Sequence, residues 1–126
     1  MDFETQVKSV CQHAFGILRL KKLYFKPITR RKAINTKKSF AIGRTNLRTG
    51  LISIDIYTPK KRQPRKLSSI LRILAHEAAH HQKKPYRQLY KGKFINRQHY
   101  PAFYSQVKRN VAKLKKDPVL KQYFNL

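Results

Sequence analysis

The sequence predicts a single α+β domain: a helix, a small three-stranded antiparallel sheet, a buried helix and a C-terminal helix. Two observations predict this order. Apolar residues recur at spacings of three and four in three stretches, which is the period of a helix with one buried face. Between the first two stretches, β-rich runs alternate with turn residues. The 126 residues allow one domain, 1–126, whose core we expect to end near residue 116, with 117–126 as a short tail.

The first helix is predicted over residues 2 to about 20, with Asp2 as its N-cap. Three strands follow over 23–28, 39–45 and 51–57, and the sequence NLRTG between the second and the third is typical of a hairpin turn. The apolar face of the first helix consists of Phe3, Val7, Val10, Cys11, Ala14, Phe15 and Leu18.

The second helix follows a surface connection over 58–66 that carries two prolines and five basic residues. We expect Ser68 or Ser69 to cap this helix, and Pro85 to end it after Lys84. Its residues are largely apolar, which predicts a buried helix.

A basic loop with tyrosines is predicted over 85–98, before the last helix. That helix runs from Tyr100 to Leu114, with Pro101 in its first turn and Asp117 followed by a proline at its end.

The charge of the chain is strongly positive, with 30 Lys plus Arg against 5 Asp plus Glu, a formal net charge of +25. The basic residues are spread along the whole chain. A folded domain with this charge repels itself and is relieved by binding a polyanion, so nucleic acid is the expected partner. A merely solvated surface, a membrane face and an acidic protein are the alternatives.

The cysteine content and the hydropathy predict a cytoplasmic protein, and association with the nucleoid or other nucleic acid is compatible with this. One cysteine, Cys11, cannot form an internal disulfide. No apolar run approaches the ~20 residues that a membrane span requires, and the N-terminus has no signal-peptide pattern.

The second predicted helix contains the sequence His76-Glu77-Ala78-Ala79-His80, an HExxH motif. Residues four apart lie one turn above each other, so His76 and His80 can bring two imidazole nitrogens to one metal ion. Glu77 projects about 100° around the helix from His76 and can reach a water molecule beside that metal. The motif predicts one Zn2+ per chain, although a three-histidine site also accepts cobalt or nickel.

Glu77 stands among apolar neighbours on this helix. An unpaired carboxylate in such surroundings is costly, so the sequence predicts a cationic partner, for which a metal site is the simplest choice. The alternative is a structural helix in which Glu77 pairs with a lysine or arginine and the histidines make ordinary hydrogen bonds.

A catalytic zinc site usually has three protein ligands, so a third ligand is expected elsewhere in the chain. No glutamate follows the motif, Asp117 lies far along the last helix, and the position that is a histidine in metzincins is Tyr86. His99 is therefore the predicted third ligand. We expect His81 and His13 to be packed histidines, or to orient other residues.

The HExxH helix is followed by His99 in an H-x-x-x-F pattern, and preceded by A-x-G-R (41–44) and an I-x-I strand (52–54). This combination resembles the SprT-like zinc metalloproteases and related small zincins, over about residues 1–116. The resemblance implies a minimal zincin core with the three histidines as zinc ligands and Glu77 as the general base. Members of the eukaryotic branch cleave proteins crosslinked to DNA. The four-cysteine module that often follows the protease core is missing here, so contact with DNA would fall to the charged surface.

The predicted function is zinc-dependent hydrolysis of peptide bonds in a protein or peptide substrate. Zinc polarises the scissile carbonyl and activates a water, while Glu77 takes the proton of that water and passes it to the leaving amine. The candidates for stabilising the oxyanion, or for orienting a ligand, are Arg72, Tyr100 and Tyr104, with Tyr86 and Tyr90 also considered.

Two other functions are compatible with the sequence. A non-catalytic, basic nucleic-acid-binding protein would use the same zinc as a structural clasp, and would need a fourth ligand, for which His81 and Cys11 are the candidates. Metal-assisted hydrolysis of a bond other than a peptide is the second alternative, because HExxH determines the metal and the base but not the substrate.

Overall fold

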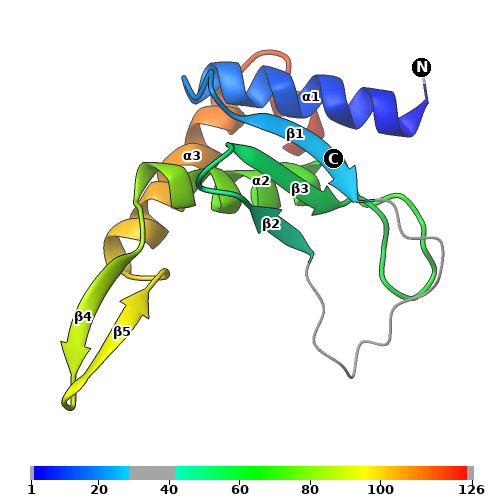
Figure 1. Cartoon of the computed structure of the whole chain (residues 1–126). Coiled ribbons are helices and arrows are strands. Elements are labelled where there is room, and N and C mark those ends of the chain that lie inside the picture. The colour runs from blue at the N-terminus through cyan, green and yellow to red at the C-terminus, as the bar shows by residue number, and fades with distance from the viewer. Residues whose placement is uncertain (1, 29–41, 125–126) are drawn as a thin grey trace.

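A computed structural model describes residues 2–28 and 42–124 of the chain (Figure 1). The helices are α1 (Phe3–Ile17), α2 (Leu67–Gln82), α3 (Pro101–Lys116) and the short α4 (Lys121–Phe124). The strands are β1 (Tyr24–Ile28), β2 (Gly43–Thr45), β3 (Leu51–Asp55), β4 (Tyr86–Tyr90) and β5 (Lys93–Arg97). The structure confirms the predicted α+β class.

The three-stranded sheet has the order β1-β3-β2. Its β2 and β3 strands are antiparallel as predicted, but β1 pairs with β3 in parallel, so the fully antiparallel sheet that we expected is wrong. The alternation of apolar residues does not determine strand direction. The third strand takes the central position because it is the most apolar, with Ile52 and Ile54 fully buried, and it thereby becomes the neighbour of both other strands.

The turn between β2 and β3 forms where the sequence NLRTG predicts it. The Asn46 side-chain oxygen accepts hydrogen bonds from the backbone N–H groups of Arg48 and Thr49. Gly50 closes the turn with a φ of +82°, and a Cβ there would lie 2.6 Å from the carbonyl oxygen of Lys22. A glycine is therefore required at this position. Residues 39–41 of the predicted strand lie outside the described residues.

The ends of the helices follow the predictions in part. The Asp2 carboxylate accepts a hydrogen bond from the backbone N–H of Thr5 at 2.7 Å and caps α1 as expected. The prediction of a serine cap on α2 is wrong: the N-cap is Lys66, without a side-chain bond, because Ser68 and Ser69 already lie in the first turn.

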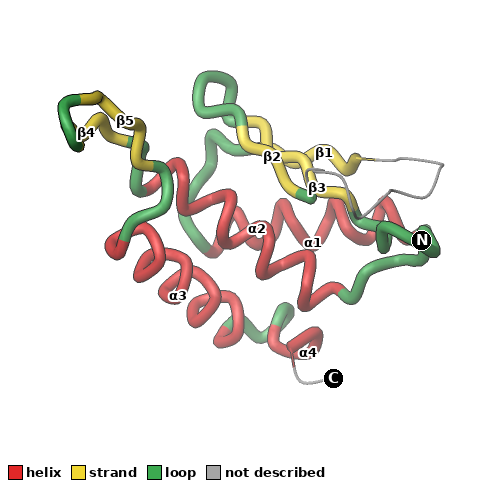
Figure 2. Tube along the Cα trace, turned by 90° about the horizontal axis from the view of Figure 1, so that it is seen from below, coloured by secondary structure: helices red, strands yellow, loops and turns green. Residues whose placement is uncertain are grey.

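The core surrounds α2, which packs against α1, β2, β3, α3 and α4. Figures 1 and 2 show the sheet and α1 on one side of α2 and α3 on the other. Leu120, from the segment expected to be a tail, is fully buried in this core. None of the described helices combines the length and the apolar character needed to cross a membrane.

The largest difference from the prediction is in the loop expected over 85–98, where β4 and β5 form a hairpin that extends from the body (Figure 1). Its residues are mostly exposed, so no alternation of buried and exposed positions marks these strands in the sequence. Lys91 and Gly92 form the turn with φ values of +50° and +77°.

A buried ion pair joins the end of β3 to the loop that precedes α2. The Asp55 carboxylate, which is fully buried, accepts two hydrogen bonds of 2.9 Å from the Arg62 guanidinium. The Arg65 Nε–H donates to the backbone carbonyl of Asp55 at 2.8 Å. These contacts order the basic loop against the sheet, and so determine where α2 begins.

We expect Arg62→Ala to lower the free energy of unfolding by roughly 3–5 kcal/mol, because it leaves the Asp55 carboxylate buried without its bidentate partner. Urea denaturation followed by circular dichroism measures this. The control is Lys61→Ala, an exposed position in the same loop, where a change within about 0.5 kcal/mol is expected. Equal stability of the two variants would contradict the role assigned to the ion pair.

Candidate metal centre

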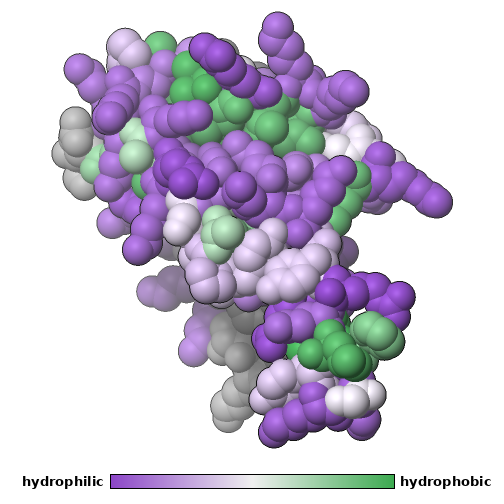
Figure 3. Space-filling view, turned by 90° about the vertical axis from the view of Figure 1, so that its left-hand side faces the viewer, coloured by the Kyte–Doolittle hydropathy of each residue, from purple (hydrophilic) through white to green (hydrophobic). Residues whose placement is uncertain are grey.

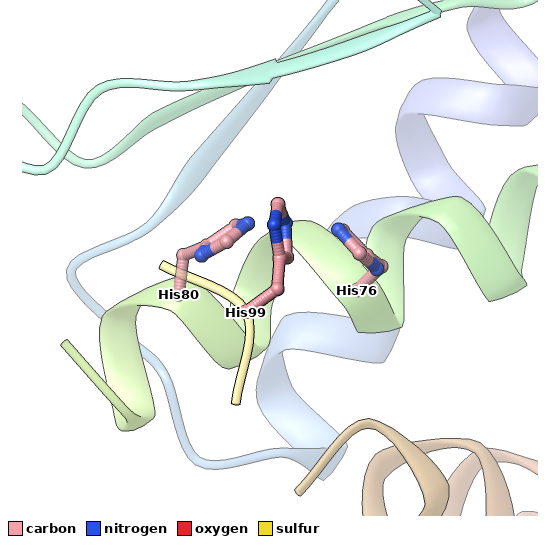
Figure 4. Close-up of side chains that lie close together, drawn as sticks. All are labelled: His76, His80 and His99. Carbon is pink, nitrogen blue, oxygen red and sulfur yellow. The ribbon is translucent and has the colours of Figure 1, made fainter. Parts of the chain in front are cut away.

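The three histidines expected to bind a metal lie together. His76 and His80 come from adjacent turns of α2, and His99 from the segment between β5 and α3. One ring nitrogen of each lies within 4.8 Å of the others, and Figure 4 shows the three rings converging on one point above α2. Helix geometry brings the His76 and His80 rings together, whereas the packing of α3 against α2 brings His99 to them.

Phe103, in the first turn of α3, packs against all three imidazole rings. It is fully buried, and its ring centroid lies 4.4 Å from that of His80, 5.0 Å from His76 and 5.2 Å from His99. Because one ring contacts the whole cluster, it restricts the rotamers of all three histidines. His99 lies two residues before α3 begins, and the chain enters the helix so that the Phe103 ring contacts the His99 imidazole.

A buried polar contact holds α3 against α2 beside the histidines. The Asn110 side chain is fully buried, and its amide N–H groups donate to the carbonyl oxygen of Ala75 at 3.1 Å and to the Gln82 side chain at 2.7 Å. Its own oxygen accepts from Gln106 at 2.9 Å. The register between the two helices is thereby determined next to His76. Sequence analysis missed this residue, because an asparagine among charged residues is typical of an exposed surface.

Glu77 lies where α2 meets the edge strand β2. It is only 8% exposed, and a Cβ placed on Gly43 would lie 3.0 Å from its carboxylate oxygen. Among the described residues, Glu77 forms no ion pair with any lysine or arginine. Burial raises the pKa of this carboxyl to about 7. The alternative in which a lysine or arginine neutralises Glu77 is therefore not supported by the described part of the chain.

A hollow of about 530 Å³ opens over these groups. It lies between α2, the edge strand β2 with the turn that follows it, and the two chain segments at the base of the hairpin. Its lining is formed by Gly43, Arg44, Thr45, Leu47, His76, Glu77, His80, Pro85, Gln98 and His99. The three histidines and the Glu77 carboxylate therefore border one solvent-accessible space.

The electrostatics of the site favour neutral imidazoles. Desolvation and then the other histidines lower the pKa of His80 to about 4, and desolvation together with His99 lowers the pKa of His76. Neutral imidazole nitrogens carry the lone pairs that a metal ion requires.

The other histidines and the cysteine take part in different contacts. His81 shares a hydrogen bond with the Thr45 hydroxyl, and His13 bonds the Asp117 carboxylate at 2.9 Å on the far side of the domain. Cys11 is buried in the α1 face of the core, where desolvation raises the pKa of its thiol. The fourth-ligand roles considered for His81 and Cys11 are therefore not supported.

Arg72, considered as an oxyanion donor, does not reach the hollow. Its guanidinium lies 5.6 Å from the ring of Phe124, beside α3 and α4. Although it precedes His76 by one helical turn, side chains on a helix lean toward its N-terminus, and a long arginine is thereby carried away from the histidines.

The tyrosines considered for the same role differ among themselves. The Tyr100 hydroxyl donates to the carbonyl oxygen of Lys84 at 2.8 Å, and its ring packs against Tyr86. Tyr104 is half exposed and its ring stacks over His99 at 6.1 Å, so it is placed to orient that imidazole. None of the five candidates considered for oxyanion stabilisation lines the hollow.

The donor set fits a divalent transition metal. Three imidazoles that converge from two chain segments, beside an accessible hollow, are the ligands of catalytic zinc sites with one open position. All five histidines, the cysteine and all five acids lie within the described residues, and only these three histidines form such a group.

No protein-family model matches the sequence, and a comparison with curated proteins finds no match. Among solved structures, the chain is similar to the crystal structure of the metallopeptidase zymogen of Pyrococcus abyssi abylysin. The identity is 18% and the TM-score 0.49, over 94% of this chain and 89% of that one. A likeness at this level establishes neither a shared site nor a shared activity.

We expect the purified chain to bind one equivalent of Zn2+, and His99→Ala to bind it at least about tenfold more weakly, because one of three ligands is lost. Titration calorimetry with a metal-free sample measures this. The control is His13→Ala, which removes a histidine outside the cluster and should leave the affinity unchanged. Equal affinities of the two variants would exclude His99 as a ligand.

Proposed function

We propose that the chain is a zinc-dependent endopeptidase of the SprT-like type. The observation that carries the proposal is the convergence of His76, His80 and His99 beside a hollow that also contains the buried Glu77 carboxylate. Ligands and a base in one accessible space are the requirements of metal-assisted hydrolysis.

The residues present divide into ligands and base. When bound by the three imidazoles, zinc supplies a Lewis acid for the scissile carbonyl and makes water a nucleophile near neutral pH. Phe103 and Tyr104 hold the imidazole rings in place. The Glu77 carboxylate takes a proton from the attacking water and transfers it to the leaving amine, so one peptide bond and one water give a carboxylate and an amine.

The form of the hollow supports an extended substrate. Among the described strands, β2 has β3 on one side and no strand on the other, and its residues 43–45 line the hollow. An edge strand presents unpaired backbone donors and acceptors, with which a substrate backbone can pair. We therefore propose a peptide bond, rather than another bond, as the one that is cleaved.

The competing function, a structural zinc in a binding protein, requires a fourth protein ligand. In the described chain, no fourth histidine, cysteine or acidic residue joins the cluster, and His99 is exposed. A metal ion held by these three imidazoles alone would keep a position for water or substrate, which favours the catalytic function.

We expect Glu77→Gln to bind zinc normally and to lose at least about a hundredfold in kcat toward a denatured protein substrate, because the base is removed while the ligands remain. The rate of appearance of new amino termini measures this. The control is Glu4→Gln, the same change at the only other glutamate, on α1. A fully active Glu77→Gln would exclude the residue from the chemistry.

A companion variant tests whether the position of the carboxylate matters. Gly43→Ala places a methyl group 3.0 Å from the Glu77 oxygen and from Ile73 without requiring a left-handed backbone, so it should lower kcat while zinc affinity is kept. Gly16→Ala in α1, where a Cβ meets nothing within 4 Å, is the matched control. A loss of zinc in Gly43→Ala would show instead that the methyl group disturbs the whole site.

We also propose that the domain binds a polyanion, with nucleic acid as the partner. A second hollow of about 550 Å³ lies beside the first, and Leu47 borders both. Its charged lining is entirely basic and consists of Arg19, Lys21, Lys22, Arg48 and Lys84, with His81. Cations gathered around one hollow support a site for phosphate groups rather than a diffusely solvated surface.

We expect the affinity for DNA to fall steeply with salt, and Lys21→Gln combined with Lys22→Gln to lower the slope of log K against log salt by about 1 to 2. Fluorescence anisotropy of a labelled DNA at several salt concentrations measures this. The same double change at Lys113 and Lys116, on the far end of α3, should have the smaller effect. A flat salt response would contradict polyanion binding.

A further inference from the structure

The β4–β5 hairpin extends away from the rest of the described domain, and the Tyr86 ring contacts Tyr100 at its base. Its two strands pack against one another and make no extensive contact with another described element. From Lys83 to Tyr100, the chain carries six lysines and arginines and no acidic residue. The exposed aromatic and aliphatic side chains are Tyr86 (45%), Leu89 (61%), Tyr90 (48%) and Phe94 (67%). In the space-filling view, the hairpin is the lower lobe, with hydrophobic residues flanked by hydrophilic ones (Figure 3).

The register of the hairpin divides its side chains between two faces. Directly paired residues of an antiparallel ribbon share a face, and successive pairs alternate. The first face, here called the tyrosine face, consists of Tyr86, Gln88, Tyr90, Lys93, Ile95 and Arg97. The opposite face consists of Arg87, Leu89, Phe94 and Asn96.

The tyrosine face combines two aromatic rings with a guanidinium between them. Arg97 is paired with Tyr86 across the ribbon, lies 5.8 Å from the centre of the Tyr90 ring, and donates a hydrogen bond to Gln88 at 2.7 Å. The Lys91 ammonium lies 5.3 Å from the same Tyr90 ring. The two tyrosines, four residues apart on one strand, are separated by about 13 Å at ~3.3 Å per residue.

We propose that the tyrosine face of the β4–β5 hairpin binds single-stranded nucleic acid, with bases stacked on Tyr86 and Tyr90 and phosphates held by Lys93 and Arg97. The inference deepens the proposed polyanion binding and rests on it. Two exposed rings on β4, each paired with a cation across the ribbon on β5, provide the two parts of a single-strand site: a stacking platform and a basic track for the backbone.

The aromatic rings distinguish this partner from other anions. A duplex keeps its bases stacked inside, so the tyrosines would gain little from it, and an acidic peptide offers carboxylates but no flat π-surface. Unpaired bases match both the rings and the charge.

The tip of the hairpin argues against a membrane as the partner. The chain turns through Lys91-Gly92-Lys93, so insertion of the tip would carry two ammonium groups into the apolar layer. The exposed Leu89 and Phe94 lie on the opposite face, and the Arg87 guanidinium lies 4.9 Å from the Phe94 ring. No face of the ribbon is apolar throughout.

The hairpin lies between the two chain segments that carry the histidines. The hairpin joins the end of α2, which carries His80, to the segment that carries His99, and Pro85 and Gln98 at its base line the metal hollow. The base of the proposed binding face, at Tyr86 and Arg97, is therefore adjacent in the chain to residues that line the hollow.

The experiment compares an oligothymidylate of about twelve nucleotides with a duplex of equal length, using the zinc-loaded full chain and fluorescence anisotropy. We expect tighter binding of the single strand, and at least about a fivefold loss for Tyr90→Ala, the effect of one lost base stack. Tyr90→Phe keeps the ring and should keep the affinity. Duplex binding should be the same in all three proteins.

Two controls separate the face from the charge. Phe94→Ala removes a more exposed ring from the opposite face and should leave the affinity for the single strand unchanged, and circular dichroism verifies that each variant is folded. Lys21→Gln combined with Lys22→Gln should weaken single strand and duplex by the same factor.

The inference is overturned if Tyr90→Ala binds the single strand as tightly as the unmodified chain does. That result would leave the broader polyanion proposal intact, because the chain would still bind DNA. Loss of all DNA binding by the unmodified chain would contradict both proposals. If the chain binds vesicles containing phosphatidylserine more tightly than it binds the single strand, and Phe94→Ala abolishes that binding, the partner is a membrane and the inference is also overturned.

Discussion

The structure depends on the burial of α2 from several sides. The sheet, α1 and α3 cover much of this helix, and one part of its surface, in its C-terminal half, borders the hollow. That part carries His76, Glu77 and His80. A helix packed so tightly cannot rotate or shift, because either motion would expose apolar residues such as Leu71 and Leu74. The directions of the imidazoles and of the carboxylate are consequences of the core.

Contacts from other elements complete the site. Phe103 packs on all three imidazoles, Asn110 joins α3 to α2, and Gly43 lets the edge strand approach the Glu77 carboxylate closely. Each of these three residues acts on the site through a contact between different elements. The hollow therefore belongs to the whole α2–α3–β2 arrangement, rather than to the HExxH motif alone.

Four of the five acidic residues are engaged in contacts within the domain. Asp2 caps α1, and Asp55 binds Arg62 in the interior. Glu4 accepts a hydrogen bond from the Tyr57 hydroxyl. Asp117 hydrogen-bonds His13 and accepts from two backbone N–H groups that precede α4. Of the five, Glu77 alone lines the hollow beside the three histidines. Because the other four acids are engaged in these contacts, the cations that surround the second hollow and those of the hairpin are left to attract an external anion.

The sequence by itself determined the features with a local cause. Helical periodicity predicted the three long helices, and Asp2 and the NLRTG turn are confirmed, since caps and turns depend on adjacent residues. The spacing of His76 and His80 follows from helix geometry, and His99 was found by elimination. Only the tertiary structure decided the parallel pairing of β1 with β3, the hairpin over 86–97, the displacement of Arg72 and the role of Asn110. The physical reason is that each of these depends on which residues, distant along the chain, pack together, and an exposed ribbon or a buried amide carries no periodic signal in the sequence.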